Sequence, residues 1–500
     1  MQYKIRRWDS VRMFISFAGA VCMVIGCILL VPLVMLIPYP KESVQAGCFI
    51  LPGTLCIAAG YFMRYFAGSL RNFKSVRNHE NALVTLAWVL VILCSGIPFM
   101  LTGNYNLTQA VFECTSGYST TGLSVVDVTQ TTHLFLFYRS VMLFVGGIGL
   151  VLVVISVFSD RYGMKLYEAE GHSDKMVPNL LKSVRVIILI YSGYIAAGTL
   201  LYMFFGMNWF DALNHSVAAV STGGFSTKAE SIGYYHSVGI QVVTIILMFL
   251  GGTNFLVHLA LLRGEWRKVY TDCEFRLSLF VYPFAAVLLA VLGGYPAAKK
   301  MPEGILMGVF QAVSAMSTTG FQTVPTFRTW PSSMLLLMIL LMIIGGGAGS
   351  TAGGIKQYRV CIALRQIGWD FRKKLTNRRA VMPRKIIRCG EKIEVDAQVE
   401  SSNMNFIFLY LLFLTAGSMI FCCFGYSVEE SLFEMASSLS TVGLSVGITG
   451  YDAHPLILWT STAGMFLGRL EIHIVFLTIA KGMVSCRNLV MHGRRRIGWS

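Results

Sequence analysis

Charged residues are scarce in this 500-residue chain. They make up 13% of the sequence, against 55% hydrophobic residues, and the mean hydropathy is +0.63. These values lie outside the range of a water-soluble globular domain of this length. The composition therefore predicts a polytopic membrane protein.

Patterns that would indicate a metal centre or an enzyme are also missing. The 12 cysteines form neither a CxxC motif nor a His-linked metal pattern, so we interpret them as small packing residues. There is no HExxH motif and no convincing Ser/His/Asp grouping, and His473 near Glu471 stands alone. The sequence predicts no enzymatic activity and no organic cofactor.

The net charge of +16 raises the question of a nucleic-acid partner, and the distribution of the basic residues answers it. If the N-terminus faces the cytoplasm, the predicted inner segments carry 34 of the 41 lysines and arginines. This is the positive-inside bias of membrane proteins. It predicts a multi-pass protein of the cytoplasmic (inner) membrane with both termini in the cytoplasm, and nucleic acid is not needed to explain the charge. The inner segments are 1–12, 62–81, 159–185, 261–276, 356–392 and 481–500.

About ten apolar runs are long enough to cross a bilayer. The first is too long for a cleavable signal peptide, and no small-residue cleavage site follows it. The eighth run is interrupted by glycine. The runs cover approximately 13–37, 47–67, 83–101, 136–158, 186–206, 238–262, 275–294, 332–366, 405–424 and 456–480.

Four short segments of nearly the same sequence each contain a Thr-x-Gly motif, with equivalent glycines at Gly122, Gly224, Gly320 and Gly443. The separations between these glycines are 102, 96 and 123 residues. An apolar span and a stretch of roughly 12 residues precede each segment, and a second span follows. A helix of that length reaches only about 18 Å, so it enters the membrane and stops midway. Small residues at helix crossings explain one such segment better than four at matching positions.

This order predicts an all-α polytopic fold. Four repeats of span, pore helix and span (M1, pore helix, M2) surround a central pore, and two extra N-terminal transmembrane helices precede them. We assign 1–75 to the extra helices and 76–165, 166–268, 269–400 and 401–500 to the four repeats, the third of which also holds a glycine-rich loop and a basic cytoplasmic linker.

The half-length helices share a phenylalanine followed by a polar residue: Phe112-Glu113, Phe210-Asp211, Phe310-Gln311 and Phe433-Glu434. Ser427 and Glu430 have the spacing of a capping box at the start of the fourth helix. The acids Glu113, Asp211 and Glu430 either add a distant negative field or cap and pack their helices, and the sequence leaves both roles open. The helix C-termini point inward, where the negative end of the helix dipole favours a cation.

Rings of backbone carbonyls replace the hydration shell of K⁺ in selective pores, and the four Thr-x-Gly strands can supply such a ring. Glycine permits backbone angles that a side chain forbids. No ring of carboxylates lies in the strands, which argues against a Ca²⁺ filter. We therefore predict that K⁺ is the transported ion and that it binds at the filter residues Thr120, Thr121, Gly122, Thr222, Gly223, Gly224, Thr318, Thr319, Gly320, Thr441, Val442 and Gly443.

The eighth apolar run breaks at a glycine-rich segment, 345–354. It is not a nucleotide-binding P-loop, because Ile355 separates Gly354 from Lys356. A break rich in small residues on the cytoplasmic side of the filter predicts a mobile loop across the pore.

Two cations fall within the predicted membrane region. Arg139 lies near the outer end of its span and can snorkel to the surface, so we expect a structural role for it. Arg469 lies mid-span, where a charge must face water or a partner, so we predict that it lines the pore with the loop carbonyls as partners. Together, the loop and the arginine predict a gate. Its residues are Gly345, Gly346, Gly347, Gly349, Ser350, Thr351, Gly353, Gly354, Lys356 and Arg469.

These features resemble the Trk/Ktr/HKT superfamily of potassium transporters, and particularly its bacterial TrkH-type members. The resemblance covers nearly the whole chain: the four filter segments, the loop, Gly468-Arg469-Leu470-Glu471 and the two extra spans. It implies a homodimer with one pore per subunit and a cytosolic, TrkA-like nucleotide-binding regulatory ring. Members with serine in place of the first filter glycine tend to carry Na⁺, so the four glycines imply K⁺.

A basic stretch after the loop is either a docking surface for that ring or a contact with membrane lipid, and both remain open. Its residues are Arg372, Lys373, Lys374, Arg378, Arg379, Arg384, Lys385 and Arg388. The leading interpretation is K⁺ uptake driven by the membrane potential, which favours an inward cation by about 2.3 kcal/mol per 100 mV. The alternative is a Na⁺- or H⁺-coupled secondary transporter of K⁺ or an organic solute, although such folds usually show two inverted halves.

Overall fold

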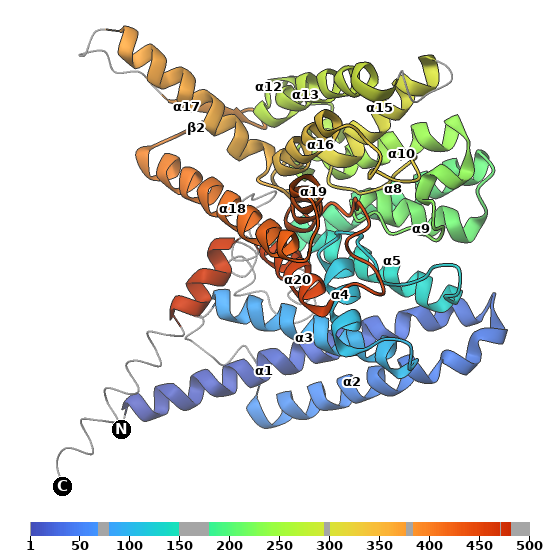
Figure 1. Ribbon diagram of the computed structural model, residues 1–500. Coiled ribbons are helices and arrows are strands. Elements are labelled where there is room, and N and C mark those ends of the chain that lie inside the picture. The colour runs from blue at the N-terminus through green and yellow to red at the C-terminus, as the bar shows by residue number, and fades with distance from the viewer. Residues whose placement is uncertain are drawn as a thin grey trace.

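The computed structural model describes residues 2–68, 80–149, 180–294, 301–376, 384–470 and 472–481. Most of these residues are helical, and the helices lie side by side in one bundle (Figure 1). The predicted all-α class is thereby confirmed, apart from one small hairpin of two strands.

Two long helices, α1 (Gln2–Leu30) and α2 (Gly47–Ala67), pack against each other at one edge of the molecule (Figure 1). Short 3₁₀ turns, η1 (Val31–Leu36) and η2 (Pro40–Gln45), join them. The helices approach closely because Gly19 faces Gly60, where an added side chain would collide with the opposing backbone. Small residues of this kind are typical of membrane helix pairs.

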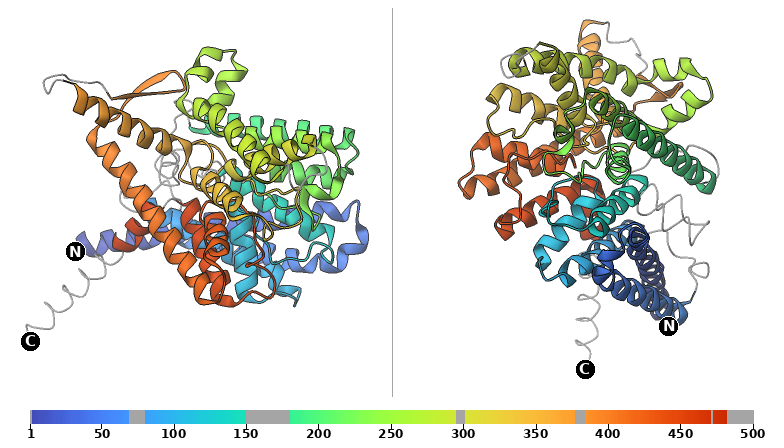
Figure 2. Two further views of the ribbon diagram at one scale, coloured as in Figure 1. Left: turned by 45° about the horizontal axis from the view of Figure 1, so that its top comes forward. Right: turned by 90° about the vertical axis from the view of Figure 1, so that its right-hand side faces the viewer.

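Each of the following four repeats has a first helix, a half-length helix and a second helix. In the right-hand view of Figure 2, the repeats surround the centre of the molecule in chain order. The first two are α3 (Glu80–Leu101), α4 (Leu107–Tyr118) and α5 (His133–Ile148), then α8 (Leu180–Phe204), α9 (Trp209–Val220) and α10 (Val238–Gly251), with η4 (Ser231–Tyr235) before α10. The third and fourth are α13 (Cys273–Leu289), α15 (Met301–Met316) and α16 (Ser332–Ile344), then α18 (Ala397–Cys423), α19 (Val428–Leu439) and α20 (Pro455–Arg469). A π-helical turn, η5 (Ala290–Gly294), extends α13. The repeat boundaries assigned from the sequence stay predictions.

Side-chain caps start the half-length helices. Asn106, Asn208 and Ser427 each accept a hydrogen bond from the backbone three residues further on. Such caps satisfy backbone N–H groups that the first turn of a helix leaves unpaired. The capping box predicted for Ser427 and Glu430 is present.

The second helices of the second and third repeats are interrupted within their predicted apolar runs. The predicted run 238–262 is bent by 105° between α10 and α11 (Phe255–Leu262), where glycines and the helix cap Asn254 interrupt it. The run 332–366 breaks at the glycine-rich loop as expected, and α17 (Gln357–Leu375) begins a separate helix. Six described helices are long and apolar enough to span a membrane, or eight if each of two bent pairs counts as one span. Of the predicted run 136–158, residues 150–158 lie outside the described residues.

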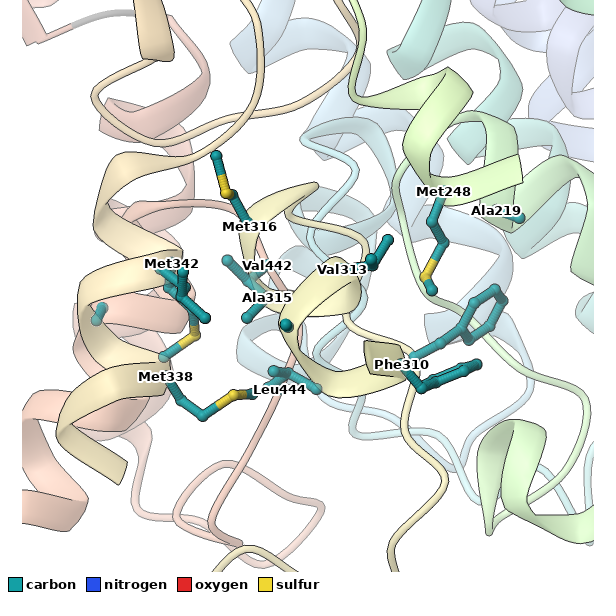
Figure 3. Close-up of a cluster of buried hydrophobic side chains, with 14 of the residues drawn as sticks. Ala219, Met248, Phe310, Val313, Ala315, Met316, Met338, Met342, Val442 and Leu444 are labelled. Carbon is teal, nitrogen blue, oxygen red and sulfur yellow. The ribbon is translucent and has the colours of Figure 1, made fainter. Parts of the chain in front are cut away.

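The half-length helix α15 is held between neighbouring repeats by buried apolar side chains (Figure 3). Met338 and Met342 of α16 lie on one side and Met248 of α10 on the other. Val442 and Leu444, which follow α19, enter the same cluster. This packing fixes the third and fourth Thr-x-Gly segments beside each other.

The connections on the side of the glycine-rich loop contain α12 (Trp266–Thr271), α17 and the antiparallel strands β1 (Lys385–Arg388) and β2 (Glu391–Glu394). The hairpin was not predicted from the sequence. Its two turn residues, Cys389 and Gly390, both have positive φ angles of 45° and 85°, as a two-residue hairpin turn requires. Two members of the predicted basic stretch, Arg378 and Arg379, lie outside the described residues.

Candidate ion-conducting site

The four Thr-x-Gly segments meet in a closed ring. At each motif glycine, an added side chain would collide with the backbone carbonyl that precedes the motif glycine of the next repeat. The last contact returns to the first repeat, so the ring closes without a gap. The four contacts are Gly122 with Gly223 O, Gly224 with Thr319 O, Gly320 with Val442 O and Gly443 with Thr121 O.

The backbone repeats the same unusual conformation four times. The first threonines, Thr120, Thr222, Thr318 and Thr441, have φ angles of 56°, 52°, 55° and 53°. The motif glycines have φ angles of 94°, 61°, 84° and 98° in the same order. A left-handed angle at a threonine costs about 1–2 kcal/mol and persists only where the surroundings enforce it. Glycine is needed for both its angle and the close approach of the neighbouring carbonyl.

The N–H groups of these strands turn back onto their half-length helices. The backbone nitrogen of Thr121 donates to Ser116 O at 2.9 Å, that of Thr319 to Ser314 O at 3.0 Å and that of Val442 to Ser437 O at 2.8 Å. The nitrogen of Gly223 donates to Ala218 O at 2.9 Å. The strand carbonyls take no part in these hydrogen bonds.

None of the twelve predicted filter carbonyls accepts a hydrogen bond from any described residue. Buried carbonyls without a donor are rare in proteins. Eight of the twelve residues are buried, with all four first threonines at 0% exposure, and the four motif glycines are half-buried. Such oxygens can serve as ligands for a dehydrated cation.

A cavity of about 430 Å³ opens on one side of the ring, and all four motif glycines line it. Lys228 and Arg139 also line it, as does Asp127. Lys228 is paired with Asp211, whose carboxylate oxygen lies 3.2 Å from its Nζ. The strands are therefore accessible from this cavity.

The glycine-rich loop covers the opposite side of the ring. Its Thr351 hydroxyl lies 3.0 Å from the Thr222 hydroxyl, and the Gly353 nitrogen donates to the Thr318 hydroxyl at 2.8 Å. A side chain at Gly353 would collide with Thr441. The loop thus contacts the first threonine of three repeats.

The loop is also held by hydrogen bonds to the break between α10 and α11 in the second repeat. The nitrogen of Gly347 donates to Gly252 O at 2.8 Å, and the nitrogen of Phe255 donates to Gly349 O at 3.1 Å. Positive φ angles at Gly345, Gly349 and Gly354 shape the loop. Ser350 donates to Gly347 O at 2.6 Å, inside the loop itself.

The two predicted cations of the gate lie in different places. Arg469 donates to Thr351 O at 2.9 Å and also to Gly146 O, so its predicted contact with the loop is present. Lys356 lies at the far end of the loop, where it lines a second cavity of about 570 Å³ together with Arg359 and Asn403. The carbonyl of Gly346 accepts the N–H of Gln357 at 2.9 Å.

Comparisons with known proteins agree with this geometry. The profile of the TrkH family, described as cation transport proteins, matches residues 53–489. The chain belongs to the TrkH family. It is 30% identical to the Trk system potassium uptake protein TrkH of Escherichia coli K12, over 85% of this chain and 94% of that one. It is 29% identical to an uncharacterized cation transporter of Methanocaldococcus jannaschii, over 92% and 94% of the two chains. The crystal structure of the potassium transporter TrkH from Vibrio parahaemolyticus has the same fold, with a TM-score of 0.82 at 24% identity over 93% of this chain and 98% of that one.

Membership of the TrkH family makes this chain a multi-pass membrane transport protein. The predicted resemblance to TrkH-type transporters is thereby confirmed.

Arg139 does not snorkel in this TrkH-family chain. Its side chain is 3% exposed, and its Nε donates to the buried Glu113 carboxylate at 2.9 Å. Its guanidinium also lies 3.9 Å from the ring centroid of Phe225 in the second repeat. Snorkelling is absent because a partner in the adjacent half-length helix removes the need to reach water, and the buried ion pair is a structural role, as expected.

The shared Phe-polar pattern aligns Asp211 of the second half-length helix with Glu113 of the first, and this alignment was wrong by one helical turn. Glu113 lies nine residues before its motif glycine, and the residue at that spacing in α9 is His215, not Asp211. Asp211 and Glu430 both lie in the first helical turn, where their N–H groups are capped by Asn208 and Ser427. The fourth-repeat counterpart of Glu113 is Glu434. The fixed spacing to each glycine was the signal that identifies these positions.

Proposed function

We propose that this chain mediates K⁺ uptake across the cytoplasmic membrane through the ring of Thr-x-Gly carbonyls, driven by the membrane potential. The observation that carries the proposal is the closed ring of buried carbonyls with no donor from the described protein. Relatives named as Trk potassium uptake proteins support K⁺ as the ion. Glycine at all four motif positions supports K⁺ over Na⁺.

Uptake of ⁸⁶Rb⁺ into proteoliposomes tests this function. Vesicles loaded with KCl in a K⁺-free medium develop an inside-negative potential only if the protein conducts K⁺, and they then accumulate tracer. We expect external K⁺ to compete with the tracer and external Na⁺ to compete poorly. Accumulation that requires an imposed Na⁺ or H⁺ gradient would instead support the alternative, a coupled secondary transporter.

We propose further that the glycine-rich loop and Arg469 form a closed gate below the ring. The loop contacts the first threonines of three repeats, and the arginine positions a charge beside the path of the cation. A positive charge near the axis opposes a resting cation. Small residues and positive φ angles allow the loop to change conformation at low cost.

Regulation by a cytosolic nucleotide-binding subunit, and assembly as a homodimer, are proposals that rest on the resemblance to Trk systems. The basic stretch offers part of a docking surface, since Arg372, Lys373, Lys374 and Lys385 are exposed. Arg384 is paired with Glu400 at 2.6 Å. Arg388 is 8% exposed, so it is buried and does not belong to this exposed surface.

Arg388 supports a connection between that surface and the gate. It donates to Ala348 O of the loop at 3.4 Å, and Ala348 N donates to Glu274 at 2.7 Å. One residue of the loop, Ala348, is therefore held on both sides, by the hairpin and by α13. The turn of the hairpin is anchored where Cys389 N donates to Asp272 at 2.9 Å. A partner that moves the hairpin would act on the loop directly.

A further inference from the structure

A layer of four side chains braces the outer ends of the Thr-x-Gly strands. Each comes from the middle of a half-length helix, nine residues before the motif glycine, and each bonds to a residue two or three positions after it. The four residues are Glu113, His215, Gln311 and Glu434.

The two acids of the layer make matching contacts with their strands. Glu113 accepts from the Ser124 hydroxyl and the Val125 nitrogen, each at 3.0 Å. Glu434 accepts from the Ser445 hydroxyl at 2.8 Å and the Val446 nitrogen at 3.0 Å. Both carboxylates therefore hold the same two positions of the strand.

Their charges differ in how they are compensated. Glu113 forms a buried ion pair with Arg139, so the pair is neutral as a unit. Glu434 is 0% exposed, and its additional donors are the nitrogen and the hydroxyl of Thr449. Among the ion pairs of the described residues, none includes Glu434.

The contacts of Glu434 favour its ionised form. Two of its four donors are backbone N–H groups, which cannot accept a proton, and each carboxylate oxygen receives one of them. A carboxylate that accepts several such bonds is stabilised relative to the neutral acid. In its ionised form, Glu434 gives the fourth repeat a negative charge at this level.

The other two members of the layer are neutral in their observed contacts. His215 places Nδ1 2.8 Å from Asp211 O and Nε2 2.9 Å from the Ser226 hydroxyl, an arrangement that suits the neutral imidazole. The Ser226 hydroxyl also accepts from Lys228 N, so its own proton is available to Nε2. Gln311 donates to the Thr323 hydroxyl at 3.2 Å.

We propose that Glu434 is a specificity-determining residue that carries the net charge of this layer and thereby sets how tightly the carbonyl ring holds its cation. The proposal rests on the proposed function of the ring. A single negative charge in a dry, fixed position acts strongly on a dehydrated ion, because water does not screen it. The neutral layer positions act on the strands by hydrogen bonding alone.

The test measures the Rb⁺ concentration for half-maximal uptake, separately from the maximal rate, in proteoliposomes. Glu434→Gln keeps the size of the side chain and removes its charge, and we expect the half-maximal concentration to rise about ten-fold. Gln311→Glu adds a charge at the equivalent position of the third repeat and is expected to lower it. The matched control is Glu430→Gln, one turn earlier in α19, which should leave it unchanged.

The double variant Glu434→Gln with Gln311→Glu separates charge from local structure. It moves the charge to a neighbouring repeat, and we expect the half-maximal concentration to return to within about two-fold of wild type, because the ring places the two positions equivalently. A merely structural role for Glu434 would not permit this rescue. If Glu434→Gln does not fold, Gln311→Glu alone decides, and an unchanged half-maximal concentration would overturn the proposal.

A further variant distinguishes failure of this inference from failure of the ring assignment. Gly443→Ser should reduce selectivity for Rb⁺ over Na⁺ in the same vesicles. If Gly443→Ser behaves as wild type, the ring is not the filter. If it loses selectivity while Glu434→Gln keeps the wild-type half-maximal concentration, only the role of Glu434 is refuted.

Discussion

Arg469 ties the fourth repeat to the loop of the third, because its Nη1 donates a hydrogen bond of 2.9 Å to the carbonyl oxygen of Thr351. The same guanidinium donates to Gly146 O in the first repeat. The hydroxyl of Thr351 lies 3.0 Å from that of Thr222 in the second. One cation and one loop residue therefore connect all four repeats directly beside the ring of strands.

Removing Arg469 should open this connection. Each hydrogen bond from a charged donor contributes about 1.5–3 kcal/mol, so Arg469→Ala should shift a closed loop toward open states by about ten-fold or more. We expect higher basal ⁸⁶Rb⁺ flux in proteoliposomes without any cytosolic subunit. Deletion within 345–354 should have the same effect.

The control for this prediction is Arg469→Lys. It keeps the charge but cannot reach two carbonyls with a planar fork, so its flux should fall between those of wild type and Arg469→Ala. An Arg469→Ala protein that is no leakier than wild type would remove the arginine from the gate.

Serine in place of Gly122 should loosen the discrimination between K⁺ and Na⁺. Gly122 has a φ of 94°, and a side chain there would collide with Gly223 O. The substitution therefore costs about 1–2 kcal/mol of backbone strain and displaces a carbonyl of the neighbouring repeat. We expect the ratio of Rb⁺ to Na⁺ flux to fall several-fold, as measured by tracer competition.

Gly450 provides the matched control, because a side chain at this position meets no atom within 4 Å. Gly450→Ser should keep the wild-type flux ratio. Equal ratios for Gly122→Ser and Gly450→Ser would contradict the assignment of Gly122 to the filter.

The sequence predicts the four motifs well because their constraint is local. At positions such as Gly122 and Gly443, a positive φ angle combines with a closely approaching carbonyl and requires glycine, so the requirement is visible in a single repeat and recurs in all of them. The break at 345–354 is visible for the same reason, since its glycines interrupt an apolar run.

Contacts between repeats leave no such local trace. The burial of Arg139 depends on Glu113, 26 residues earlier, and on Phe225 in another repeat. The bend at Asn254 escapes a count of apolar length, because the residues on both sides stay apolar. Asp211 was aligned with Glu113 because a local Phe-acid pair occurs in both helices, whereas the distance to the motif glycine fixes the true register.

Substitution of Arg388 should weaken the hold of the cytoplasmic hairpin on the loop. Arg388→Gln removes the charged donor to Ala348 O, while Glu274 still accepts from Ala348 N. We expect a raised basal flux, by about three-fold to ten-fold, and a smaller response to the proposed cytosolic subunit, because one bond from a charged donor is lost. The measurement is ⁸⁶Rb⁺ flux with and without that subunit.

Lys385 on the same hairpin supplies the control. It is exposed, and its Nζ lies 3.5 Å from the exposed Glu394, so Lys385→Gln leaves the loop contacts intact. This variant should show wild-type basal flux. If both variants leak equally, the effect belongs to the hairpin as a whole and not to the Arg388 contact with Ala348.

Acid should weaken a contact between the outer ends of the third and fourth repeats. Glu430, outside the spanning helices, accepts from Arg328 at 3.0 Å, and this guanidinium holds the pKa of Glu430 below its ordinary value of 4.5. Because the pKa is lower in the folded than in the unfolded protein, the pair stabilises the fold above pH 4.5, and the contribution is lost as the pH falls through the folded-state pKa.

Arg328 is 55% exposed, so the contribution at pH 7 is at most about 1 kcal/mol. Thermal unfolding in detergent should show a lower midpoint for Glu430→Gln than for wild type at pH 7, and the difference should shrink as the pH falls from 4.5 through the folded-state pKa. Arg328→Gln should reproduce this profile, and a difference that persists in acid would show that the ion pair is not its cause.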